Sequence, residues 1–144
     1  MMRSRQYQSI KAWQLADDLA VKIYDVTKMF PTEERYGLIS QMRRASISVA
    51  ANIVEGATRA SRKEYLQFLS VARGSLSELR YYLHLSKRLG YLDTQTYREE
   101  DGLCDETARV LYGLAQSVKR SLIEPVDMSV EDVTFQREKL KSGV

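Results

Sequence analysis

The chain has 144 residues, of which 44% are hydrophobic, with 22 Lys and Arg against 19 Asp and Glu. This length fits one domain with a substantial hydrophobic core. Two prolines and seven glycines are too few for the many turns of an all-β fold, and a single cysteine excludes a disulfide framework within the chain. We find no apolar signal-peptide core near the N-terminus and no apolar run close to the roughly 20 residues that span a bilayer. We therefore expect a cytoplasmic protein with no membrane role.

The net charge of +3 hides an uneven distribution along the chain. Residues 35–92 contain ten basic and three acidic residues, whereas residues 93–144 contain seven basic and eleven acidic ones. A polarised chain of this kind either steers a polyanion toward its basic part or pairs the two parts with each other in one fold. The sequence leaves both interpretations open.

Apolar residues at helical spacing predict four long helices. The first runs from about Ser9 to Met29 and ends before Phe30-Pro31, because proline disfavours helical geometry at the residue before it. The residues that follow, up to Arg35, are expected to form a turn.

The second predicted helix runs from about Arg35 to Glu55, with Gly56 as its stop. One face repeats at spacings of four and three, and this inner seam consists of Leu38, Met42, Ala45, Val49 and Asn52. The opposite side carries a narrower apolar stripe, the outer stripe, which consists of Tyr36, Ile47, Ala51 and Val54. A helix in a lone four-helix bundle needs only one buried face, so the outer stripe predicts contact with another subunit.

The third predicted helix opens with Ser61 and Glu64 at capping-box spacing and ends at Gly90. Gly74 in its middle predicts the close approach of another helix, because a glycine there weakens the helix itself. The fourth begins near Asp93 or Thr94.

The fourth predicted helix continues to about Ile123, where Glu124-Pro125 closes it. Four long helices with short joints predict an all-α fold: an antiparallel up-down-up-down four-helix bundle that occupies residues 1–124. Residues 125–144 form a C-terminal tail, predicted to be a short helix or disordered.

The chain offers little that resembles catalytic chemistry. His84 is the only histidine and is expected on a solvated face, and Cys104 is interpreted as a buried structural thiol. There is no E-x-x-H pair and no Cys/His cluster, so we predict neither a metal site nor a cofactor. The acidic run of residues 99–101 is interpreted as solvated helix surface, and Asn52 as a buried amide that fixes helix alignment. The sequence therefore predicts a protein that is not an enzyme.

The basic residues offer a stronger signal. Arg73, Arg80 and Lys87 recur every seven residues and align on one side of the third helix, a spacing that can follow a phosphate backbone. The alternative is that these cations pair with acids at the start of the antiparallel fourth helix: Arg80, Lys87 and Arg88 with Asp93, Glu99 and Asp105. Exposed pairs of this kind add little stability. The candidate nucleic-acid-binding residues are Arg43, Arg44, Arg62, Lys63, Arg73, Arg80 and Lys87, of which Arg62, Lys63 and Arg73 have no obvious acidic partner.

Three stretches together carry a family resemblance: KAWQLADDLAVKIYDVTKMF, FPTEERYGLISQMRRASISVAANIVEG and SRKEYLQFLSVARGSLSELRYYLHLSKRLGYL. Over about residues 9–122 the chain resembles the four-helix-bundle family that includes proteins encoded within 23S rRNA intervening sequences. The resemblance implies a ring-like homopentamer. That family is also similar in fold to the accessory variability proteins of diversity-generating retroelements, basic pentamers that bind a reverse transcriptase and nucleic acid. No catalytic residues follow from it.

These observations lead to a hypothesis with one main alternative. We expect a non-enzymatic homo-oligomeric scaffold that binds RNA or DNA through phosphate contacts on a basic surface. The alternative is a protein-interaction adaptor that docks a partner protein, such as a reverse transcriptase, and has no nucleic-acid role.

Overall fold

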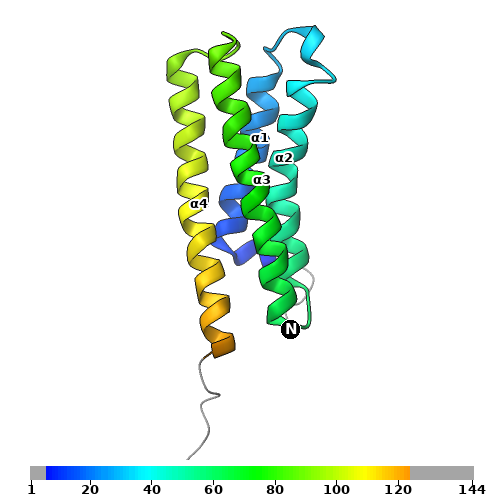
Figure 1. Cartoon of the computed structure of the whole chain (residues 1–144), viewed down its shortest axis with the longest axis vertical. Coiled ribbons are helices and arrows are strands. Elements are labelled where there is room, and N and C mark those ends of the chain that lie inside the picture. The colour runs from blue at the N-terminus through cyan, green and yellow to red at the C-terminus, as the bar shows by residue number, and fades with distance from the viewer. Residues whose placement is uncertain (1–5, 124–144) are drawn as a thin grey trace, which may run out of the picture.

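The computed structural model describes residues 6–123, which form four long helices packed side by side (Figure 1). The helices are α1 (Lys11–Thr27), α2 (Leu38–Ala57), α3 (Arg62–Arg88) and α4 (Thr94–Ile123), with two short 3-10 helices, η1 (Gln6–Ser9) and η2 (Thr32–Glu34). No strand occurs in this part of the chain, so the all-α prediction with four helices is confirmed. None of the described helices combines the length and apolarity needed to cross a membrane. The predicted tail, residues 125–144, lies outside the described residues.

Consecutive helices run in opposite directions (Figure 1). The Ser48 hydroxyl of α2 lies 2.8 Å from the Ser75 hydroxyl of α3, and near the start of α2 the Met42 sulfur accepts a hydrogen bond from the Ser86 hydroxyl at 3.5 Å. Residue numbers therefore rise along α2 while those of its neighbours on α3 fall, as antiparallel packing requires. No Cα atoms of α2 and α4, or of α1 and α3, lie within 8 Å of each other, so these two pairs lie diagonally across the bundle.

Local sequence signals set both ends of α3. The Ser61 side chain accepts a hydrogen bond from the Glu64 backbone N–H at 3.2 Å, as its capping spacing predicts. At the other end Gly90 has a φ of +80°, and the Tyr91 N–H donates to the Ser86 carbonyl at 2.9 Å. This C-terminal geometry needs a residue that tolerates the left-handed region, which explains the glycine.

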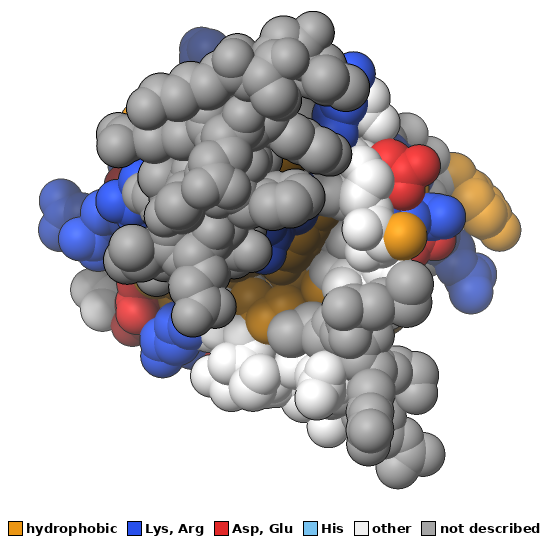
Figure 2. Space-filling model, turned by 90° about the horizontal axis from the view of Figure 1, so that it is seen from below, with side chains coloured by type: hydrophobic (Ala, Val, Ile, Leu, Met, Phe, Trp, Pro, Cys, Tyr) orange, Lys and Arg blue, Asp and Glu red, His pale blue; other side chains and the backbone are white. Residues whose placement is uncertain are grey.

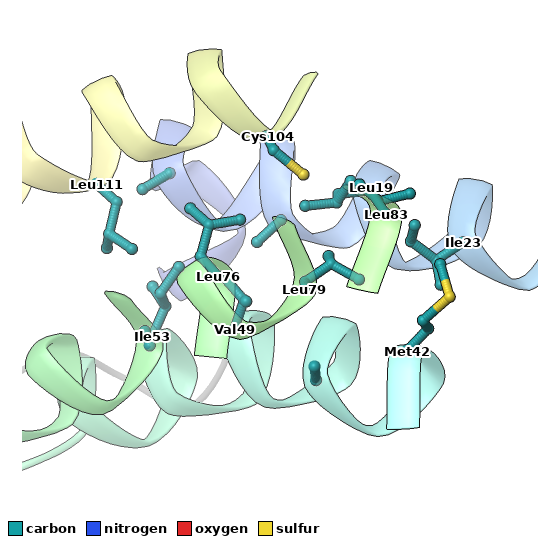
Figure 3. Close-up of a cluster of buried hydrophobic side chains, with 14 of the residues drawn as sticks. Leu19, Ile23, Met42, Val49, Ile53, Leu76, Leu79, Leu83, Cys104 and Leu111 are labelled. Carbon is teal, nitrogen blue, oxygen red and sulfur yellow. The ribbon is translucent and has the colours of Figure 1, made fainter. Parts of the chain in front are cut away.

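The hydrophobic core runs along the axis of the bundle, and each of the four helices contributes fully buried side chains (Figure 3). Among them are Leu19 and Ile23 of α1, Met42, Val49 and Ile53 of α2, Leu76, Leu79 and Leu83 of α3, and Cys104 and Leu111 of α4. Four members of the predicted inner seam of α2, Leu38, Met42, Ala45 and Val49, are buried as expected. Burial of this face holds α2 in register against α1 and α3.

Asn52, the fifth predicted member of the inner seam, is only half-buried. Its amide donates to the Ser48 carbonyl at 2.8 Å and to the Ser48 hydroxyl at 3.0 Å, beside Ser75 of α3. The fully buried polar residue of α2 is instead Ser46, whose hydroxyl donates to the Arg43 carbonyl at 2.9 Å. The polar group at Asn52 therefore belongs to the α2–α3 boundary and not to the centre of the core.

The glycines also differ from the prediction. Gly56 is not the stop of α2, which continues to Ala57; a Cβ at Gly56 would lie 2.7 Å from the Tyr65 ring and 2.9 Å from the Phe68 Cβ. A Cβ at Gly74 would meet nothing within 4 Å. The glycine that permits close helix approach is therefore Gly56, and the expectation for Gly74 is wrong.

Glu100 contradicts the interpretation of residues 99–101 as solvated surface. Its side chain is on the core-facing side of α4 and only 5% exposed, and its Oε2 atom has no hydrogen-bond partner among the described residues. Burial raises the pKa of this carboxyl; the charge of Lys22 lowers it, and that of Glu99 raises it further. The structure thus buries one carboxyl group of this run, and its ionised form is disfavoured.

Candidate nucleic-acid interface

Three cations gather where α2 passes into α3. Arg62 and Lys63 are exposed in the first turn of α3, and neither contacts an acidic side chain within residues 6–123. The Arg59 guanidinium lies 4.7 Å from the centre of the Phe68 ring, a cation–π contact that still leaves the charge at the surface. These side chains are available to a partner from solvent.

The last turns of α4 bring two more cations to the same end of the bundle, because α3 and α4 are antiparallel (Figure 1). Lys119 and Arg120 are both exposed. Figure 2, viewed from below, shows Lys and Arg side chains at several points around the rim of this end. Of the acidic residues, only Glu55 and Glu64 fall within segments 55–64 and 114–123. We call this cation cluster the basic end; it consists of Arg59, Arg62, Lys63, Lys119 and Arg120.

The other predicted stripe on α3 faces α4. The Arg73 guanidinium lies 5.3 Å from the centre of the Tyr112 ring, and the Lys87 ammonium lies 4.8 Å from the centre of the Tyr97 ring. Both cations are exposed and neither is paired with an acid in the described residues. Two of the three stripe residues therefore combine an available charge with an aromatic neighbour.

Arg80, between them, is paired internally. Its Nε atom lies 3.1 Å from an Asp101 carboxylate oxygen, and a second nitrogen lies 3.7 Å from Asp105. The hydrogen bond to Asp101 is the main reason that the pKa of Arg80 is raised above its ordinary value, while partial burial opposes the rise. For Arg80 the alternative interpretation, pairing with the start of the fourth helix, is confirmed.

Arg43 and Arg44 tie α2 to its two neighbours. The Arg43 Nε atom donates to the Thr27 hydroxyl at 3.0 Å, and its guanidinium stacks 4.5 Å above the centre of the Tyr24 ring of α1. Arg44 forms an ion pair with Glu78 of α3. Both side chains are engaged within the fold, so they are weaker phosphate-binding candidates than the residues of the basic end.

The predicted outer stripe lies on the outside of the bundle. Tyr36 is 88% exposed and Ile47 is 46% exposed, while Ala51 is exposed and Val54 is half-buried. A shallow groove of about 540 Å³ lies beside the stripe, between α1 and the start of α2. Its lining consists of Tyr24, Arg35, Tyr36, Ile39, Ser40, Arg43, Arg44 and Ile47.

The titratable groups most often used in catalysis are not assembled here. His84 is exposed on α3, whereas Cys104 is fully buried in α4. Burial raises the pKa of the Cys104 thiol to about 12, against a smaller opposite effect of Arg80, so it carries almost no thiolate at neutral pH. Within residues 6–123, no group of three or more His, Cys, Asp and Glu side chains is placed to hold a metal ion.

Sequence reasoning missed five residues of this surface: Arg59, Tyr97, Tyr112, Lys119 and Arg120. Tyr112 is 51% exposed and lies against Arg73, although 39 positions separate them in the chain. A signal for this pairing existed in the sequence. If the third and fourth helices are antiparallel and joined near Gly90, residues 73 and 112 lie at similar positions along the bundle axis. The helical wheel of each helix alone does not contain that information.

The fold and the cation surface define a compact antiparallel four-helix bundle with a basic end. The model of the 23S rRNA-intervening sequence protein family matches residues 8–113, and the chain belongs to this family. The chain is also similar to a protein of unknown function from the S23 ribosomal protein family of Bacteroides thetaiotaomicron. The crystal structure of that protein superposes with a TM-score of 0.68 at 24% identity, covering 73% of this chain and 95% of that one. No curated protein matches the chain.

Proposed function

We propose that this protein is a non-enzymatic, homo-oligomeric scaffold of the cytoplasm that binds RNA or DNA through phosphate contacts at its basic end. The observation that supports it best is the exposure of Arg62 and Lys63, free of acidic partners in the described chain, with three more cations at the same end. Phosphates neutralised by such side chains release condensed counterions, which gives affinity without base specificity.

RNA is the polyanion to test first, because the family is named after intervening sequences of 23S rRNA. Along α3, Arg73 and Lys87 would extend the contact away from the basic end. Arg80 contributes less charge, since Asp101 and Asp105 neutralise it, and Arg43 and Arg44 serve mainly to join helices.

The test compares two charge reversals of equal size. R62E/K63E removes two cations of the basic end, whereas the matched control K22E/K28E reverses two exposed cations on and just after α1, the helix diagonal to α3. Fluorescence anisotropy with labelled RNA would follow affinity between about 50 and 200 mM salt. We expect R62E/K63E to weaken binding and to reduce the slope of log affinity against log salt by roughly 0.7 per lost contact. Equal affinities of the two variants would contradict the assignment.

The homo-oligomeric part of the proposal is supported by the outer stripe. Tyr36, in the turn before α2, and Ile47 of α2 expose apolar surface on the outside of the bundle, where burial needs a second chain. We expect I47D to shift the protein to a smaller mass in light scattering. The control is L89D, which places the same charge at a 50% exposed leucine outside the stripe. A wild-type protein that is monomeric in dilute buffer would refute this part.

The groove between α1 and α2 favours a second candidate function, docking of a partner protein. Its lining contains aromatic and aliphatic side chains together with Arg35, Arg43 and Arg44, and no acidic residue. An adaptor of this kind would retain one stoichiometric protein in a pull-down, would lose it on Y36D, and would show little dependence on salt.

A further inference from the structure

The line where α3 meets α4 contains a small polar pocket of about 150 Å³. Leu76 of α3 and Ala108 of α4 are the apolar part of its lining, and Arg73, Ser77, Arg80 and Tyr112 complete it. The volume corresponds to roughly five water molecules, which is enough for one planar heterocycle and too little for a protein segment.

The side chains of this pocket match the chemistry of a nucleotide. Tyr112 offers a half-exposed aromatic face, and Arg73 beside it holds a charge that no acid of the described chain neutralises. A base can stack on the ring while its phosphate binds the guanidinium, as happens in proteins that bind single strands. The Ser77 hydroxyl in the lining can exchange hydrogen bonds with the edge of a base, whereas Asp101 and Asp105 pair with Arg80 and do not line the pocket.

A second cation–aromatic pair lies farther along the α3–α4 boundary. Lys87 lies over the Tyr97 ring, fourteen residues beyond Arg73 on α3, which is about 21 Å along the helix axis. Stacked nucleotides rise by about 3.4 Å each, so roughly six would connect the two cation–aromatic pairs. In the other direction Arg62 lies about 16 Å before Arg73 and connects the pocket with the basic end.

We propose that the α3–α4 edge, made of Arg73, Ser77, Arg80 and Lys87 with Tyr97 and Tyr112, binds unpaired nucleotides of a single strand. A paired base inside a duplex has both faces covered by its neighbours, so it cannot stack on Tyr112. This inference rests on the proposed function and names the form of nucleic acid that the surface prefers.

The experiment measures the affinity of the full chain for a labelled 12-nucleotide RNA and for the same RNA annealed to its complement. We expect Y112A to weaken single-strand binding by roughly 5- to 100-fold and to leave duplex binding unchanged. Y112F keeps the ring and should stay within about twofold of wild type, and R73Q should weaken the single strand more than the duplex. The control Y81A removes a tyrosine that is 58% exposed on α3 but outside the pocket, and should have no effect.

The outcomes separate this inference from the proposed function. If R62E/K63E abolishes binding while Y112A and R73Q leave single-strand affinity unchanged, the basic end binds nucleic acid but the edge does not. The inference would also be overturned if Y112A lost the same amount of affinity for the single-stranded RNA and for the duplex. If the wild-type protein binds neither the single-stranded RNA nor the duplex, both the proposed function and this inference are refuted. If Y112A instead releases a bound partner protein, the pocket belongs to that protein and not to a nucleotide.

Discussion

Replacing Glu100 by leucine is expected to stabilise the protein. Its Oε2 atom is buried without a hydrogen-bond partner in the described chain, and leaving a buried polar group unsatisfied costs about 1–3 kcal/mol. Leucine has a similar volume and contains no polar group that burial would leave without a partner. We therefore expect E100L to raise the free energy of unfolding by about 1–3 kcal/mol near pH 7, equivalent to a rise of roughly 3–12 °C in Tm.

The dependence of this gain on pH identifies its cause. Burial raises the folded-state pKa of Glu100 above its ordinary value of 4.5, so the folded wild type holds a proton that the unfolded chain releases. The wild type therefore loses stability as the pH rises from 4.5 through the folded-state pKa, and the penalty is constant above it. Thermal unfolding followed by circular dichroism should show the advantage of E100L shrinking as the pH is lowered toward 4.5. E106L, at an exposed glutamate of the same helix, is the control. A destabilised E100L, or a gain identical at both pH values, would refute the reasoning.

Three further predictions concern packing, helix ends and the thiol. In urea unfolding, G56A should destabilise the protein by about 1–3 kcal/mol, because its Cβ would clash with the Tyr65 ring. G74A should stabilise the protein by up to about 1 kcal/mol, because no atom lies within 4 Å of the added Cβ. Stability changes of the same sign in both variants would contradict the packing around these glycines. S61A should lower the free energy of unfolding by about 1 kcal/mol, because it removes the N-terminal cap of α3. The control is S117A, at an exposed serine within α4 that caps no helix. Cys104 should resist a thiol reagent at pH 8 in the folded protein and react fully in denaturant, because its thiol is buried with a pKa of about 12. Rapid reaction of Cys104 in the folded protein would contradict this and show that α4 opens.

The helices could be predicted because their signals are local. The inner seam of α2 repeats within a few turns, and the ends of α3 depend on Ser61 and Gly90, each of which acts on neighbouring backbone groups. Such interactions hardly depend on the rest of the fold. The predicted boundaries accordingly differ from the observed ones by three residues or fewer at every helix end.

The errors arose where a residue's environment comes from another helix. Glu100 lies in a run of three acids and reads as surface, yet it is four residues before Cys104 and seven before Thr107, both fully buried. Gly56 was predicted to end α2 because glycine commonly follows a helix. Its actual role depends on the Tyr65 and Phe68 side chains of α3, which pack directly against it. Asn52 has seam spacing, but Ser48 and the neighbouring α3 supply a polar boundary that the α2 sequence alone does not show.

The candidate site was predictable in its charges and not in its shape. Arg62 and Lys63 stood out because they lack acidic partners, and the structure leaves them exposed. Their companions Lys119 and Arg120 are more than fifty positions away in sequence, and only the antiparallel course of α3 and α4 brings them to the same end (Figure 1). The aromatic partners of Arg73 and Lys87 likewise come from α4 and follow from the register between the two helices.

The positions of the two surfaces decide whether self-association and nucleic-acid binding are compatible. The outer stripe lies on α2 and the turn before it, and α2 is diagonal to α4, with no Cα atoms of the two helices within 8 Å. Copies that associate through Tyr36 and Ile47 would therefore leave the α3–α4 edge open to solvent. Each added subunit would present another copy of the edge and of the basic end. A long RNA could then contact several subunits at once, and each further contact would be intramolecular and would raise its affinity. An oligonucleotide that reaches only one subunit would not gain this affinity. A bundle with one associating face and one binding face, as we propose, would thus need only a modest net charge of +3 per subunit to bind a polyanion.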